Sequence, residues 1–155
     1  MKTIILYATK HGAAAEAARR IAAKINGAVI YDLKEGAPSL EGFDCVILGS
    51  GVYAGMIRGE AKAFLSQNAD ALLEKKLGLF LCGLDQGEGK TFFDANFSPM
   101  LLQKAKAASL LGGIFDPQKA GFFERLIIKI VTKKTVYTNT IDDNKIEQFA
   151  KTMRE

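Results

Sequence analysis

A chain of 155 residues is long enough for one globular domain with its own core, and 48% hydrophobic and 25% charged residues are ordinary for that class. Its net charge of +4 is mild and dispersed, which argues against a nucleic-acid-binding protein. The chain has one histidine and two cysteines, and both cysteines lie in apolar runs. We therefore expect no metal site and a reducing, cytoplasmic setting.

Apolar runs alternate with helical segments along the chain. We expect strands at residues 2–8, 28–33, 45–49, 77–82 and 108–115. Helices are expected at about 12–25, 59–68 and 99–106, and a last helix is expected to start near Asp142; the polar stretch 34–42 holds one turn at most. This alternation predicts an α/β fold with a five-stranded parallel sheet, in strand order 2-1-3-4-5, between two helical layers.

The loop after the first strand, residues 9–12 (the first loop), opens directly into a helix. Thr9, Lys10 and Gly12 offer a hydroxyl, an ammonium group and a close approach to the backbone. The unbonded N–H groups and the positive dipole end of a helix N-terminus favour an anion at this point. The first loop is therefore a candidate phosphate site, and an ordinary βα turn is the alternative.

Two further loops leave the same edge of the predicted sheet. The second loop, residues 49–55, contains three glycines, Ser50 and Tyr53, whose flat ring could stack on a planar ligand. The third loop, residues 83–89, is glycine-rich, and its N–H groups could reach the same ligand. A flexible turn and a plain surface loop are the respective alternatives.

Two glycine patterns resemble nucleotide-binding motifs but fail on spacing. Gly89-Lys90-Thr91 follows a strand, as the end of a P-loop does, but the P-loop spacing requires a glycine at the position of Leu84. The glycine present, Gly83, lies one residue too early. In the segment from Gly49 to Gly55, the third glycine is one position too late for a dinucleotide fingerprint. That fingerprint also follows the first strand of the fold, whereas this segment follows the third. Neither pattern supports nucleotide hydrolysis or a dinucleotide cofactor.

These segments together resemble the flavodoxin family. Thr9-Lys10-His11-Gly12-Ala13-Ala14 matches the pattern Thr/Ser-x-Thr-Gly-x-Thr at Thr9 and Gly12. The chain is similar, nearly end to end, to the flavodoxin-like branch that includes the menaquinone-dependent protoporphyrinogen IX oxidases. That likeness rests on residues 7–12, residues 49–55 and an expected insertion after the fifth strand, residues 122–129. His11 and Ala14 depart from the family pattern, which usually has hydroxyls or other polar residues there.

The resemblance implies a non-covalently bound FMN, with its phosphate on the first loop and its ring between the second and third loops. The cofactor-binding residues implied in this way are Thr9, Lys10, His11, Gly12, Ala13, Ala14, Ser50, Gly51, Val52, Tyr53, Gly55, Gly83, Leu84 and Asp85. No side chain is nominated as catalytic, since the chemistry would belong to the flavin.

We expect one domain over residues 1–155 with a helical insertion at about 118–134. Apolar residues recur every four positions from Phe122 to Ile130 and, one residue on, from Phe123 to Val131, with basic residues along one edge. A helix packed on the domain would explain this pattern. A surface helix at 121–134 that docks on an anionic membrane, or closes over a porphyrin or quinone, is the alternative.

The function expected from these features is an FMN-binding oxidoreductase, similar to protoporphyrinogen oxidase and passing electrons to a quinone. A positive net charge with Lys10 and Arg58 near the crevice favours a less reducing flavin than that of acidic electron carriers. Two alternatives remain open: a flavodoxin-type electron carrier that serves a protein partner, and a flavin-free interaction domain.

Overall fold

The computed structural model describes residues 1–84, 87, 89–117 and 137–155. Its main sheet has the order β2-β1-β3-β5-β6, with bounds Val29–Asp32, Thr3–Ala8, Cys45–Tyr53, Lys76–Cys82 and Ala107–Leu110. All four neighbouring pairs on this path are parallel. Since β5 and β6 are the fourth and fifth strands of the prediction, the expected order 2-1-3-4-5 is confirmed.

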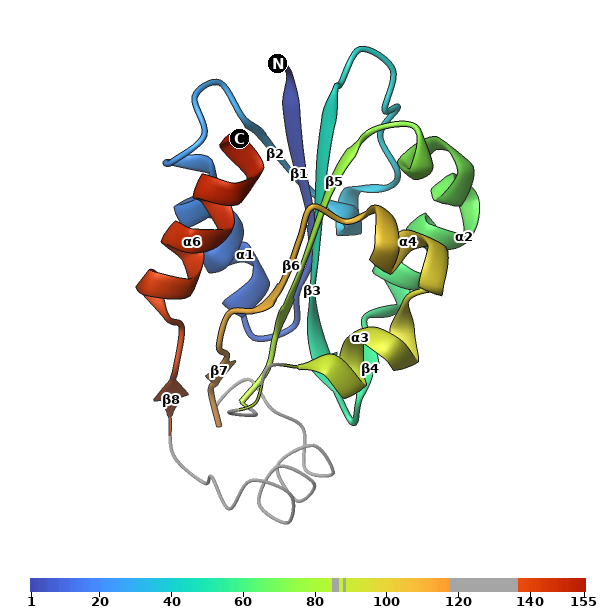
Figure 1. Cartoon of the computed structure of the whole chain (residues 1–155). Helices are drawn as coiled ribbons and strands as arrows, with labels where there is room; N and C mark the ends of the chain where they lie inside the picture. Colours follow the sequence, from blue (N-terminus) through green and yellow to red (C-terminus); the bar gives the residue numbers. More distant parts are fainter. Residues whose placement is uncertain (85–86, 88, 118–136) are drawn as a thin grey trace.

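Helices cover both faces of this sheet (Figure 1). Helices α1 (Ala13–Ala22) and α6 (Asp143–Arg154) lie on one face. Helices α2 (Gly59–Leu73), α3 (Lys90–Asn96) and α4 (Pro99–Lys104) lie on the other. Successive strand residues point to opposite faces, so Ile5 joins the core on the α1 side, while Ile4 and Leu6 join the core on the α2 side. The central strands are therefore apolar on both faces, as the continuous runs predicted.

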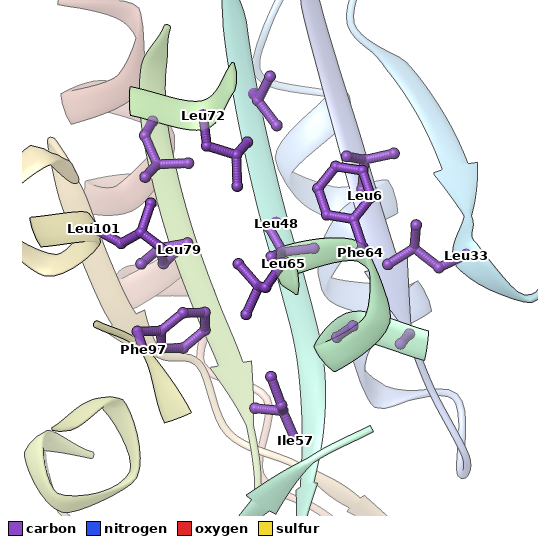
Figure 2. Close-up of a cluster of buried hydrophobic side chains, with 14 of the residues drawn as sticks. Leu6, Leu33, Leu48, Ile57, Phe64, Leu65, Leu72, Leu79, Phe97 and Leu101 are labelled. Carbon is purple, nitrogen blue, oxygen red and sulfur yellow. The ribbon is translucent and has the colours of Figure 1, made fainter. Parts of the chain in front are cut away.

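Three leucines from neighbouring strands contribute the sheet's side chains to the core on the α2 side (Figure 2). Leu6 pairs with Leu48, and Leu48 pairs with Leu79 across the sheet. Phe64 and Leu72 of α2 pack against them and are almost completely buried. This packing fixes α2 against the middle of the sheet.

Small side chains bring α1 close to the sheet on the other face. Ala14, Ala17 and Ala18 have no exposed surface. Two ion pairs then join α1 or the turn after it to α6, Arg20 with Asp143 at 2.7 Å and Lys24 with Glu147 at 2.6 Å. Helix α1 is thus packed against the sheet along its buried face and tied to α6 at its C-terminal end.

The structure corrects the prediction for residues 49–55. Strand β3 does not end at Gly49 but continues to Tyr53, turns at Ala54 and Gly55, and returns as β4 (Met56–Ile57). Both turn residues have positive φ, 51° and 78°, the conformation of a tight hairpin turn. The second loop is therefore a β-hairpin rather than an open loop.

Other boundaries differ because tertiary contacts override local pattern. Strand 108–115 is interrupted: β6 ends at Leu110, and a separate β7 (Ile114–Phe115) pairs with β8 (Thr138–Asn139). Gly112 lies at this break with a φ of 95°, and the Thr140 carbonyl approaches so closely that an added Cβ would overlap it. Helix α3 was not predicted, and α2 runs five residues past the expected end at Asn68, to Leu73. The single turn expected within 34–42 is a 3-10 turn at Leu33–Glu35.

Within the described ranges, no helix is long and apolar enough to cross a membrane. The expected insertion at about 118–134, including the segment 121–134, lies outside the residues that the structure describes.

Candidate functional site

The three candidate loops begin side by side at one end of the sheet. Ala8, the last residue of β1, pairs with Ser50, and Gly51 pairs with Cys82, the last residue of β5. The hairpin β3–β4, the start of α3 and the β7–β8 pair all lie at this end, opposite the chain termini (Figure 1). The sheet therefore brings together the first loop, the hairpin and the start of the third loop, as the sequence predicted.

The first loop presents backbone donors at the start of α1. The Thr9 hydroxyl accepts a hydrogen bond from Gly12 N at 2.9 Å, which closes the loop on itself. Gly12 precedes α1 with a φ of 91°, a conformation that favours glycine, and no side chain caps the helix. The N–H groups of the first helical turn have no partner within the helix and point toward the loop. An anion placed there would accept several hydrogen bonds from one rigid element.

Side chains of the first loop reach two other segments of the site. The Lys10 ammonium lies 5.5 Å from the centre of the Tyr53 ring, a cation–π distance that joins the first loop to the hairpin. The His11 ring meets Phe115 of β7 edge to face, with centroids 5.8 Å apart. The first loop therefore contacts the hairpin through Lys10 and β7 through His11, although both elements are far from it in sequence.

Ser50 stabilises the base of the hairpin through its hydroxyl group. Its side chain is buried, with 1% of the residue exposed. The hydroxyl donates to Gly51 O at 2.8 Å and accepts from Arg58 N at 2.9 Å, so it fixes the end of β4 against β3. The Nε atom of Arg58 is buried and has no hydrogen-bond partner among the described residues.

Asn96, the last residue of α3, holds the tip of the hairpin and was missed by the sequence analysis. Its amide nitrogen donates to Gly55 O at 2.9 Å and to Phe92 O at 2.8 Å, and its amide oxygen accepts from Ile57 N at 3.1 Å. An asparagine at a helix end usually indicates only a helix stop. Nothing in the sequence indicates a contact with residues about forty positions earlier.

Gly83 lies between the hairpin and the segment that follows β6. A Cβ added to Gly83 would lie 3.8 Å from Val52 Cβ, and Gly83 N donates to Gly112 O at 3.0 Å. A Cβ on Gly113 would lie 2.6 Å from the Gly83 carbonyl carbon, so the two backbones are in close contact. Leu84 is half-buried beyond this point, and Asp85 lies outside the described residues.

The ionisable groups near the site include a thiol that is inert at neutral pH. Complete burial raises the pKa of Cys82 to about 12. Burial, and then the charge of Asp32, raises the pKa of Tyr7 above its usual value. Cys82 is therefore a packing residue rather than a nucleophile. Among the described residues no group of acidic, histidine and cysteine side chains could hold a metal ion.

A family model described as a flavodoxin domain matches residues 4–142. The chain belongs to this flavodoxin family. No curated protein matches it in sequence.

Solved structures agree on the fold. Flavodoxin 1 from Bacillus cereus matches with a TM-score of 0.58 and 17% identity, over 99% of this chain and 95% of that one. The rubredoxin oxygen:oxidoreductase of Desulfovibrio gigas matches with a TM-score of 0.61 and 15% identity over 99% of this chain, which spans only 36% of that protein. A Fusobacterium nucleatum flavodoxin, solved with flavin mononucleotide bound, has a TM-score of 0.46 and 20% identity over 69% of this chain and 68% of that one. At these identities the first two matches show the flavodoxin fold and no more.

Proposed function

We propose that this flavodoxin-family chain binds FMN non-covalently and acts as an FMN-dependent oxidoreductase. The observation that carries the proposal is the uncapped N-terminus of α1 behind the first loop, with Tyr53 held beside that loop by Lys10. The phosphate would lie on the N–H groups at the start of α1, and the flavin ring would lie between the hairpin and Gly83.

The residues present fit this cofactor. A Cβ added to Gly12, Gly51 or Gly55 would meet no heavy atom within 4 Å, so the backbone at these three positions is open to a ligand. The donors of the first loop are a hydroxyl, an ammonium group and backbone N–H groups, which suit a phosphate.

The two departures from the family pattern are compatible with the same site. Ala14 is completely buried in the core on the α1 side, where its methyl group packs among apolar neighbours. His11 packs against Phe115 instead of occupying the helix start. Neither change removes the backbone donors of α1, which supply the phosphate site whatever the side chains are.

The bound flavin would accept electrons from a substrate and pass them on. The chain itself would contribute the face of the Tyr53 ring and the positive charge of Lys10 beside the flavin. Positive charge near a flavin stabilises its electron-rich form and raises its reduction potential. The net charge of +4 acts in the same direction, which supports an oxidase-type role over that of a strongly reducing electron carrier.

At the level of the reaction, we propose a protoporphyrinogen-oxidase-like activity with a quinone as electron acceptor. The likeness of residues 7–12 and 49–55 to that branch supports this choice. The apolar and basic segment 121–134, which would contact a membrane or cover a porphyrin or quinone, belongs to the same proposal. Binding to anionic vesicles at low salt would support the membrane contact, and no binding would refute it.

The test is the visible spectrum of the purified protein, followed by turnover with a small quinone. Flavin bands and quinone reduction support an FMN-dependent oxidoreductase. Flavin bands without quinone turnover would instead favour an electron carrier for a protein partner. A colourless protein that ignores added FMN would refute the proposal and favour a flavin-free interaction domain.

A further inference from the structure

The hairpin that carries Tyr53 has a short ladder, which Ser50 supports at its base but not at its tip. Strands β3 and β4 share only two residue pairs, Val52 with Ile57 and Tyr53 with Met56. The turn includes Ala54 at a φ of 51°, a conformation that side chains other than glycine rarely adopt. Met56, one of the four residues in these pairs, is 42% exposed and adds little packing to the hairpin. The position of Tyr53 therefore depends on contacts from outside the hairpin.

Asn96 supplies such contacts to the turn and to the returning strand β4. Its amide group gives both hydrogens to carbonyls, those of Gly55 and Phe92, and its oxygen accepts from Ile57 N. This pattern defines the orientation of the amide, because a flipped group would direct its oxygen at two carbonyl oxygens. Asn96 thus binds the turn and the returning strand at once.

The element that carries Asn96 is itself anchored in the core. Phe93 and Phe97 flank Asn96, are 5% and 6% exposed, and stack with ring centroids 5.8 Å apart. Helix α3 begins at Lys90, directly after the third loop, and ends at Asn96 on the hairpin. One short helix therefore connects the third loop to the hairpin. A ring bound between these two segments would need the distance between them to be fixed.

We propose that Asn96 is a positioning residue of the cofactor site. It acts through Gly55 and Ile57 to hold Tyr53 against the first loop, at the distance seen in the contact with Lys10. This inference rests on the proposed FMN site, but the contact between Lys10 and Tyr53 can be measured without any flavin.

Asn68 provides a matched control. It is also a half-buried helical asparagine, and its amide nitrogen donates to Phe64 O at 3.0 Å, four residues earlier, just as Asn96 donates to Phe92. Asn68 lies in α2 and has no hydrogen bond to the hairpin. A variant of Asn68 therefore removes the intrahelical bond alone.

The experiment compares Asn96→Ala, the conservative Asn96→Asp, and Asn68→Ala with the unmodified protein. FMN affinity is measured by quenching of flavin fluorescence. In ligand-free protein, NMR measures the ring-current shift that Tyr53 imposes on the side-chain protons of Lys10. We expect both Asn96 variants to weaken FMN binding by about tenfold or more and to lose the Lys10 shift, because each removes hydrogen bonds to the tip. Asn68→Ala should keep the shift and stay within about twofold in affinity.

The proposal is overturned if Asn96→Asp is folded and keeps both the affinity and the Lys10 shift, or if Asn68→Ala weakens FMN as much as Asn96→Ala. If the unmodified protein does not bind FMN, the proposed function fails. The Lys10 shift then still decides whether Asn96 positions Tyr53, since its loss in both Asn96 variants supports that role and its retention refutes it.

Discussion

Replacing Gly12 with alanine separates backbone strain from cofactor binding. Gly12 has a φ of 91°, and an added Cβ would meet no heavy atom within 4 Å. The whole loss of stability therefore comes from placing an L side chain in the left-handed region, about 1–2 kcal/mol. For a domain of this size, that loss corresponds to a fall in Tm of about 2–4 °C for each kcal/mol.

Gly27 provides the control, since its φ is 75° and its Cβ would also meet no heavy atom within 4 Å. Gly27 follows α1 at the other end of the sheet from the first loop, so Gly27→Ala should lose similar stability and keep its FMN affinity. Gly12→Ala should weaken FMN by about tenfold or more, because its methyl group would enter the approach to the α1 N-terminus and displace charge-assisted hydrogen bonds. Thermal melts and FMN titrations well below Tm measure the two effects separately. Unchanged FMN affinity in Gly12→Ala, or equal weakening in Gly27→Ala, would refute the placement of the phosphate.

Three further predictions concern charge and packing. Lys10→Met should weaken FMN and lower the two-electron potential of the bound flavin, because a positive charge beside Tyr53 is lost; a raised potential in dye-equilibration measurements would contradict this. Hydrogen bonds from two arginines of the same helix lower the pKa of Glu16, so the stability it gives is present above pH 4.5 and is lost as the pH falls through the lowered value. Glu16→Gln should therefore have a lower Tm than the unmodified protein at pH 7, and the difference in Tm should shrink as the pH falls below 4.5. A difference that does not change with pH would show that the charge is irrelevant. Gly49→Ala should destabilise the fold by about 1–3 kcal/mol, since its Cβ would overlap the Phe80 ring, whereas Gly51→Ala should be near neutral in urea unfolding.

The sheet could be predicted because its strands are buried on both faces. Runs such as residues 45–48 and 77–82 are apolar throughout, and most of the segments between the runs are long enough for the crossover helices of a parallel sheet. The doubly wound arrangement then predicts the strand order, and that order places the first loop, Ser50 and Gly83 at one edge of the sheet.

The details of the site depend on contacts distant in sequence. The turn at Ala54 and Gly55 lacks the Asn-Gly or Asp-Gly signal of a two-residue hairpin, so β4 was not predicted. Helix α3 is only seven residues long and is fixed by burial of Phe93 and Phe97, which local pattern does not reveal. The role of Asn96 arises from the packing of α3 on the hairpin, and no residue near it in the sequence indicates that contact.

The most direct test of the account is titration of flavin-stripped protein with FMN and, in parallel, with riboflavin, which has the same ring but no phosphate. The account predicts saturable FMN binding and much weaker riboflavin binding, because the α1 N-terminus and the first loop bind the phosphate. No FMN binding would contradict the central claim, and equal binding of both ligands would contradict the assignment of the first loop as the phosphate site.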